Sequence, residues 1–265
     1  MSPLIHNTLF HQFKINAVYL AFEVEKNSLG LALEAMRSLG IRGVNITIPF
    51  KEEAVNFIDE IPEDVDRCVG AINTVVNRDG QLYGYNTDGT GFLVALKEDL
   101  AFNPEGKKIL VLGAGGAARG IAFALARAHA DTIMIHNRTR ERAQGLSEYV
   151  AEHFPETNLE VSGDTETAVG EKPDLIVNAT SLGMKKGDEP PLDLHRLKKP
   201  ASIYELVYSP DETPFLKQAK DLHWPHANGL GMLAAQAALS FELWTGEKTG
   251  VRETMLEVLK KCTHS

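Results

Sequence analysis

A glycine-rich stretch, GAGGAARG, lies in the middle of the chain between a strand pattern at residues 108–112 and a helical pattern. In the spacing Gly-x-Gly-x-x-Ala, the first glycine permits a tight turn, the second admits a pyrophosphate to the backbone, and the small third residue lets helix and strand pack closely. Helix N-terminal amides then face the phosphates. A purely structural turn is the alternative, but the strand-turn-helix context favours a dinucleotide site. Its predicted contact residues are Gly113, Ala114, Gly115, Gly116, Ala117 and Ala118.

The end of the next strand pattern indicates which dinucleotide fits. An NAD site usually has an acid about 20 residues after the glycine turn, whereas this chain has HNRTRERA. Arg138 and Arg142 are four residues apart and can share one face of a helix that Thr139 caps. Two guanidinium groups there would bind a 2′-phosphate and leave NAD with unpaired positive charge. NADP is therefore the predicted cofactor, held also by Asn137 and Thr139; the alternative is a solvated basic turn.

Two other polar stretches stand where predicted strands end. Lys51 follows the strand pattern 43–48 and a proline, and in the first turn of a helix it would oppose the helix dipole. Asp88 belongs to the stretch GYNTDGTGF. Each has an ordinary explanation, because Lys51 can be a surface lysine and residues 86–89 are typical of a helix N-cap. The local sequence leaves both alternatives open.

The elements that must position these residues fall into two series. Helix and strand patterns alternate up to about residue 99, with Ser2 as the N-cap of the first helix and a hairpin signal at Asp79-Gly80. The stretch FNPEGKK is typical of a linker, and βαβ units follow it, which implies parallel sheets with right-handed crossovers. The predicted helices are 2–13, 28–40, 115–130, 139–154, 231–246 and 251–262, and the predicted strands or hairpins are 17–24, 43–48, 71–86, 108–112, 132–137, 173–180 and 201–208.

We therefore predict an α/β fold of two domains. Residues 1–102 form a substrate-binding catalytic domain with a mixed, mainly parallel sheet, and residues 103–230 form a Rossmann-like NADP-binding domain. The helices of residues 231–265 are expected to return to the substrate domain and pack on it.

Composition excludes several classes of partner. The formal charge of −9 and a pI near 5.5 give no general attraction for phosphate backbones, so nucleic acid is not expected as a partner. No run approaches the roughly 20 apolar residues of a membrane span, and no leader sequence is evident. Cys68 and Cys262 stand alone, without a metal-binding or redox spacing. A cytoplasmic protein without a metal site is predicted.

Eight motifs in order resemble the shikimate dehydrogenase family and span nearly the whole chain. They are SPLIHN, GVNITIPFK, GAINT, GYNTDG, GAGGAARG, NRT, NATSLGM and NGLGMLAAQAALSFELWTG. The resemblance implies a two-domain α/β enzyme that reduces 3-dehydroshikimate to shikimate with NADPH in aromatic amino-acid biosynthesis. It also implies a small-molecule substrate and a monomer or homodimer.

The resemblance assigns roles to single residues. Lys51 and Asp88 match the catalytic pair, with Lys51 as proton donor to the ketone oxygen and Asp88 as its partner. The matches for substrate binding are Ser2, Thr47, Asn73, Tyr208 and Gln236, of which Ser2 and Tyr208 match the positions that hold the carboxylate. The matches on the nicotinamide side of the cofactor are Thr180, Ser181, Leu206 and Gly229. Gln236 can alternatively serve helix packing, and Leu206 can be plain core.

The sequence departs from the family pattern at its beginning. Family members usually start with a further strand and the motif His-Ser-x-Ser-Pro, whereas Met1 here precedes the second serine. Either the true start lies upstream, or a truncated chain has lost one hydroxyl donor, with an expected loss of about tenfold or more in substrate affinity. Two other functions stay open. One is a quinate-accepting dehydrogenase, and the other is a noncatalytic NADP-binding regulatory protein, against which Lys51 and Asp88 count.

Overall fold

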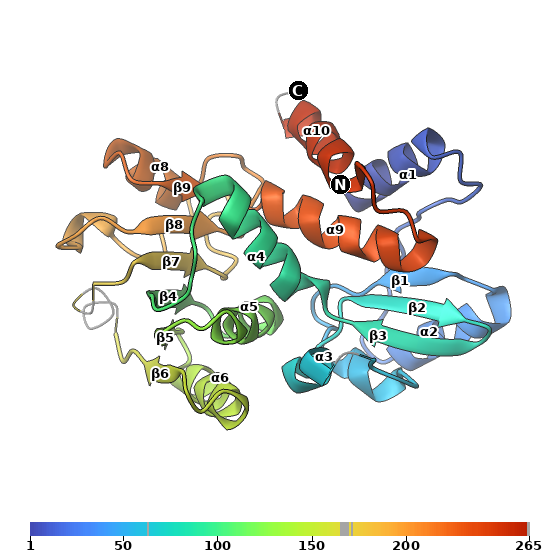
Figure 1. Ribbon diagram of the computed structural model, residues 1–265, viewed down its shortest axis with the longest axis horizontal. Coiled ribbons are helices and arrows are strands. Elements are labelled where there is room, and N and C mark those ends of the chain that lie inside the picture. Colours follow the sequence, from blue (N-terminus) through green and yellow to red (C-terminus); the bar gives the residue numbers. More distant parts are fainter. Residues whose placement is uncertain (63, 165–169, 171, 264–265) are drawn as a thin grey trace. The chain divides into compact units, whose positions relative to one another are not determined.

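A computed structural model of the chain describes residues 1–62, 64–164, 170 and 172–263, whose helices and strands form two units (Figure 1). Unit 1 comprises Met1–Gly91 and Leu233–Ser265, and unit 2 comprises Phe92–Met232. The division falls inside the helices α4 (Thr87–Leu100) and α9 (Leu230–Thr245), and not at the linker after residue 102. A continuous helical pattern carries no signal at such a point, so the sequence could not mark it.

Unit 2 contains a six-stranded parallel sheet in the order β6-β5-β4-β7-β8-β9 (Figure 1). The strands are β4 (Lys108–Leu112), β5 (Thr132–His136), β6 (Asn158–Val161), β7 (Leu175–Asn178), β8 (Ser202–Glu205) and β9 (His226–Ala227). The central strands are buried on both faces, which explains their nearly unbroken apolar runs. The strand order reverses between β4 and β7, and ligands of such sheets bind at the carboxyl ends of the strands there.

Helices follow most of these strands. They are α5 (Gly116–Arg127), α6 (Arg140–His153), the short 3-10 helix η2 (Leu194–Arg196) and α8 (Pro214–Asp221). Phe215 and Leu216 of α8 pack into one core with Leu110, Ile176 and Ile203 of the sheet. The prediction of a Rossmann-like domain is confirmed. The sequence analysis missed three elements: β6 is half polar, β9 has two residues and α8 has eight.

The sheet of unit 1 corrects the prediction of a mainly parallel sheet. It has three antiparallel strands in the order β1-β2-β3. The strands are β1 (Gly43–Asn45), β2 (Thr74–Arg78) and β3 (Gln81–Tyr85). The hairpin signal between β2 and β3 is confirmed, since Asp79 and Gly80 both have positive φ, at 53° and 87°. Such angles match the right-handed twist of the flanking strands.

The predicted strand 17–24 does not form. Its residues have no regular secondary structure and pair with no strand in the described part of the chain. Instead, the side-chain amide of Asn7 accepts the N–H of Tyr19 at 2.7 Å and donates to its carbonyl at 2.9 Å. Asn7 thus replaces a neighbouring strand at this point. The alternating apolar residues that suggested a strand, Val18, Leu20 and Phe22, remain exposed.

Helices cover both faces of the small sheet of unit 1 (Figure 1). On one face, α2 (Leu29–Leu39) contributes Leu29, Leu33 and Met36 to a core with Val75 and Leu82. On the other face, Trp244 of α9 packs against Val76 and Tyr85. Trp244 Nε1 donates to the Val75 carbonyl at 3.0 Å and lies where a Cβ on Gly43 would stand, so this position requires glycine.

The remaining elements of unit 1 are α1 (Ser2–Gln12), the 3-10 helix η1 (Glu53–Phe57), α3 (Asp64–Val69) and α10 (Val251–Thr263). The N-cap of α1 is Met1 and not Ser2, so Ser2 already belongs to the helix and Pro3 stands in its first turn. The predicted end of α2 at Gly40 is confirmed by its left-handed conformation. None of the described helices has both the length and the hydrophobicity that a bilayer crossing needs.

The stability of unit 1 is expected to decrease at acidic pH because of His6. Its ring is fully buried on α1, with its centroid 4.6 Å from that of Tyr19 and 5.2 Å from that of Trp244. Within the described residues neither ring nitrogen has a hydrogen-bond partner, and burial lowers the pKa of His6 from 6.5 to about 4. The unfolded chain therefore binds the additional proton between these values, and stability falls as the pH falls from 6.5 towards 4.

We expect His6 to cost unit 1 about 2 kcal/mol of unfolding free energy between pH 7 and pH 5. His6→Phe keeps an aromatic ring and removes the titrating group. Its unfolding free energy should therefore decrease by about 2 kcal/mol less than that of the wild type between pH 7 and pH 5. Urea unfolding at the two pH values measures the difference. His11→Phe, at an exposed position of the same helix, is the matched control. Equal pH dependence of wild type and His6→Phe would contradict the prediction.

Candidate functional site

Lys51 and Asp88 form a short ion pair in unit 1. Lys51 Nζ lies 2.6 Å from Asp88 Oδ2, and the two side chains are only 15% and 7% exposed. Lys51 belongs to a turn between β1 and η1, so it is not a residue of an α-helix, and its carbonyl accepts the N–H of Ile72 at 2.8 Å. Asp88 stands in the first turn of α4. The fold therefore aims Lys51 inward and does not leave it on the surface.

The helix cap and the ion pair use different residues. The Asn86 side-chain oxygen accepts the N–H of Asp88 at 3.1 Å, while its amide nitrogen donates to the Ala71 carbonyl at 2.8 Å. Asn86 thus provides the cap that the sequence suggested. The Asp88 carboxylate is consequently free to bind Lys51.

Asn73 fixes the second oxygen of that carboxylate. Its Nδ2 donates to Asp88 Oδ1 at 2.9 Å, and its Oδ1 accepts the N–H of Thr87 at 2.8 Å. Because the Thr87 N–H identifies the acceptor end of the amide, Nδ2 must face Asp88. Asn73 is 2% exposed, so this orientation is held inside the unit. Asn73 is the predicted substrate residue that the structure places nearest to the ion pair.

Gln236 reaches the same cluster from α9. Its Oε1 lies 3.4 Å from Asn73 Nδ2. A Cβ on Gly91 would lie 2.8 Å from the backbone nitrogen of Gln236, so only glycine allows α4 and α9 to approach this closely in unit 1. The backbone of Gln236 therefore packs against α4, as the helix-packing alternative predicted, and its side chain reaches Asn73. Its role in substrate binding stays a prediction.

Ser2 joins the cluster through residues that the sequence did not reveal. Burial raises the pKa of the Tyr19 hydroxyl, and the Ser2 side chain opposes this effect. That hydroxyl donates to Asn45 Oδ1 at 2.9 Å. Asn45 Nδ2 lies 3.2 Å from the Asn73 carbonyl and 3.0 Å from Ser240 Oγ. Thr47, two residues beyond β1, is exposed. Tyr19 and Asn45 stood in predicted strands, where alternation predicts burial but not polar partners.

Unit 2 presents the glycine turn at the topological switch point. A Cβ on Gly113, whose φ is 116°, would lie 3.0 Å from the Ala179 carbonyl oxygen, so the turns after β4 and β7 touch there. A Cβ on Gly115 would meet nothing within 4 Å. Gly115 is the N-cap of α5, and no side chain among the described residues caps this helix, while Ala118 is fully buried. This cradle fits a pyrophosphate on the N-terminal amides of α5.

The predicted 2′-phosphate ligands lie at the end of β5. Thr139 is the N-cap of α6, as predicted, although its side chain makes no capping bond and its carbonyl accepts from Asn137 Nδ2 at 2.8 Å. Arg138 and Arg142 are exposed, and no ion pair engages either guanidinium within the described residues. Two available cations beside a helix N-terminus suit a phosphate monoester.

The other predicted cofactor residues lie after the neighbouring strands. Thr180 and the exposed Ser181 follow β7, and Leu206 follows β8. A Cβ on Gly229 would lie 2.1 Å from the Leu206 carbonyl oxygen, so these two residues touch. Tyr208, predicted to bind substrate, is half-buried in unit 2, whereas the other predicted substrate residues belong to unit 1.

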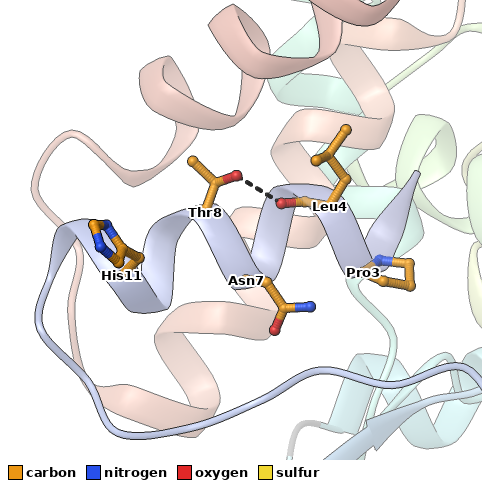
Figure 2. A pocket seen from close by; sticks show the side chains of 5 residues that line it. All are labelled: Pro3, Leu4, Asn7, Thr8 and His11. Carbon is orange, nitrogen blue, oxygen red and sulfur yellow. Dashed lines mark hydrogen bonds between the residues drawn. The ribbon is translucent and has the colours of Figure 1, made fainter.

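A pocket lies elsewhere, along α1 (Figure 2). Its lining residues are Pro3, Leu4, Asn7, Thr8 and His11. Thr8 donates to the Leu4 carbonyl at 2.8 Å, and Asn7 is bonded to the Tyr19 backbone. Because these polar groups are already used inside the fold, the pocket offers less chemistry than the Lys51 cluster.

Three family models match this chain. "Shikimate dehydrogenase substrate binding domain" matches residues 1–75, "Shikimate / quinate 5-dehydrogenase" matches residues 96–182, and "Shikimate 5'-dehydrogenase C-terminal domain" matches residues 229–260. A shikimate dehydrogenase (NADP(+)) of Geobacillus kaustophilus is 43% identical to this chain, over 98% of this chain and 95% of the relative.

Solved structures are also similar. The shikimate 5-dehydrogenase of Thermus thermophilus, in complex with NADP(H) and shikimate, has a TM-score of 0.86 and 35% identity, and the match covers 98% of this chain and 93% of that chain. A quinate dehydrogenase of Corynebacterium glutamicum in complex with NAD has the same TM-score of 0.86 at 29% identity, covering 97% and 94%.

Proposed function

Because this chain belongs to the shikimate dehydrogenase family, and therefore reduces 3-dehydroshikimate to shikimate with NADPH, we propose that Lys51 and Asp88 are its catalytic pair. We further propose that unit 1 supplies most of the residues that bind the substrate and that unit 2 supplies Tyr208 and binds the cofactor. The observation that carries the proposal is the 2.6 Å contact between Lys51 Nζ and Asp88 Oδ2, with Asn73 on the other carboxylate oxygen.

The chemistry of ketone reduction needs a hydride and a proton. NADPH, when bound, supplies the hydride. Lys51, as an ammonium, donates a proton to the ketone oxygen and stabilises the negative charge that develops on it. Asp88 holds the ammonium in place and accepts a hydrogen bond from a substrate hydroxyl. In the oxidation of shikimate, neutral Lys51 takes the proton back from the hydroxyl.

The remaining predicted residues serve recognition. In unit 1, Asn73 and Gln236 offer amides to the hydroxyls of a small polyhydroxy acid, while Ser2 and Thr47 offer hydroxyl donors. The Tyr208 hydroxyl is assigned to the carboxylate. In unit 2, the amides of residues 113–118 hold the pyrophosphate, and Arg138 and Arg142 hold the 2′-phosphate. Thr180, Ser181, Leu206 and Gly229 line the nicotinamide end.

Steady-state assays with shikimate and with quinate, each against NADP and NAD, test this function. The expected result is turnover of shikimate with NADP, with a preference over NAD of about tenfold or more because a charged phosphate contact is lost with NAD. Faster turnover of quinate would assign the chain to the quinate-oxidising members of the family. Binding of NADP without any turnover would indicate a regulatory protein instead.

A further inference from the structure

Glu205 is a fully buried acid at the carboxyl end of β8 in unit 2. Its two oxygens each lie 2.9 Å from Asn178 Nδ2, at the end of the adjacent strand β7. Oε1 also accepts the N–H of Val207 at 3.1 Å, and Oε2 accepts the Thr213 hydroxyl at 3.3 Å. One carboxyl group therefore joins the ends of two strands and the residue that caps α8.

Asn178 passes this constraint to the loop after β7. Its Oδ1 accepts both the N–H and the hydroxyl of Thr180, at 3.0 and 2.7 Å, while its Nδ2 reaches the Leu182 carbonyl at 3.2 Å. Because Nδ2 is the donor end that faces Glu205, the carboxylate decides which way this amide is turned. The position of Thr180 thus depends on Glu205 through one side chain.

The same acid acts on the loop after β8. The bond from Val207 N–H fixes the turn that contains Leu206, and the Leu206 N–H donates to the Asn178 carbonyl at 3.0 Å. The Val207 carbonyl in turn accepts the N–H of Gly229 at 3.3 Å, and a Cβ on Gly229 would overlap the Leu206 carbonyl oxygen. Three of the four residues assigned to the nicotinamide end are therefore tied to Glu205.

We propose that Glu205 is a positioning residue for the nicotinamide end of the cofactor site, and that its ionised form holds Thr180, Leu206 and Gly229 where NADPH binds. This inference rests on the proposed cofactor site. The acid itself is enclosed by its protein partners, so it acts through the loops and not by contact with substrate.

Protonation of Glu205 would loosen this arrangement. The groups that face its carboxyl within the described residues are neutral: the Asn178 amide from β7, the backbone amides of residues 206 and 207, and the Thr213 hydroxyl. Burial raises the pKa of Glu205 from 4.5 to about 7, against the opposing effect of these hydrogen bonds. A proton is placed most easily on Oε2, because only the Thr213 hydroxyl can turn from donor to acceptor. The proton on Oε2 then weakens the hydrogen bond that Asn178 Nδ2 donates to this oxygen.

Glu205→Gln tests the proposal, because its amide imitates the neutral acid. The dissociation constant of NADPH is measured for wild type and variant from pH 5.5 to 8.5 by fluorescence titration. The 2′-phosphate also titrates near pH 6, so the ratio of the two constants at each pH is the readout. We expect the variant to bind about tenfold more weakly at pH 8.5 and the ratio to approach one at pH 5.5.

Two further variants make the test specific. Asp174 precedes β7, at the end of this strand opposite to Asn178, and accepts hydrogen bonds from Lys108 N–H and Lys199 Nζ. For Asp174→Asn, the ratio of its NADPH dissociation constant to that of the wild type should not change with pH. Thr213→Val removes one donor from the carboxylate and should move the pH dependence to higher pH, which keeps the proposal testable if Glu205→Gln does not fold. A pH-independent ratio for Glu205→Gln, or the same profile for Asp174→Asn, overturns the proposal. Turnover of shikimate by the wild type is measured first and decides the function separately.

Discussion

Replacement of Lys51 by alanine is expected to lower kcat for shikimate oxidation by about 100- to 10,000-fold, with a much smaller change in KM. The variant loses the group that we propose to transfer the proton, and general acid-base catalysis contributes about this factor. Asn73 and Gln236, which we propose to bind the substrate, keep their positions, because their hydrogen bonds do not involve Lys51. Single-turnover kinetics should accompany the steady-state measurement, so that chemistry is separated from product release.

The structure adds a condition to this experiment. Without Lys51, the Asp88 carboxylate is buried and keeps only the Asn73 amide as a side-chain partner among the bonds described here. An uncompensated buried charge is costly, so the folded state of the variant must be verified by its unfolding midpoint. Lys26→Ala, at an exposed position of the same unit, is the matched control and should retain wild-type kcat. A folded Lys51→Ala variant with unchanged kcat would remove Lys51 from the mechanism.

Replacement of Arg138 by alanine is expected to weaken NADP binding by about 10- to 100-fold and to leave NAD binding unchanged. A charged hydrogen bond to a phosphate contributes roughly 1.5–3 kcal/mol, and NAD has no phosphate at the 2′ position. Combining Arg138→Ala with Arg142→Ala should bring the two affinities close together. Calorimetric titration with each dinucleotide gives the required ratio of dissociation constants.

Salt provides an independent measure of the same contact. Screening weakens exposed charge pairs, so the affinity of the wild type for NADP should fall with ionic strength more steeply than that of Arg138→Ala. Arg127→Ala, at an exposed arginine in the last turn of α5, is the control and should behave as wild type. If Arg138→Ala left the ratio of NADP to NAD affinity unchanged, the 2′-phosphate would have to bind elsewhere.

The parts of the fold that the sequence predicted correctly have local signals. The run 108–112 and its glycine turn, the hairpin at Asp79-Gly80 and the end of α2 at Gly40 each depend on neighbouring residues only. The prediction of a strand at residues 17–24 was wrong because strand formation also depends on residues outside the segment. Its alternation is real, but a strand also needs a partner, and the side chain of Asn7, twelve residues away from Tyr19, takes the backbone bonds instead.

The site shows the same limit. Local sequence singled out Lys51 and Asp88 separately but could not show that they meet across 37 positions of the chain. The bond between Asn178 and Glu205 joins residues 27 positions apart, so the sequence could place Glu205 in an apolar strand pattern but could not identify its partner. Side-chain bonds of this kind follow from the packing of whole strands, which periodicity does not encode. The assigned roles of the site residues remain predictions for the kinetic experiments.

Unit 1 is discontinuous in sequence, and this has a consequence for synthesis. Its first part ends at Gly91, and its second part begins at Leu233, after all of unit 2. On the ribosome, the small sheet therefore emerges long before Trp244, which closes one of its faces, and before Gln236, which reaches Asn73. Unit 2 can fold as a continuous segment in the meantime. The nascent chain should acquire the glycine turn of unit 2 first and the complete cluster around Lys51 last.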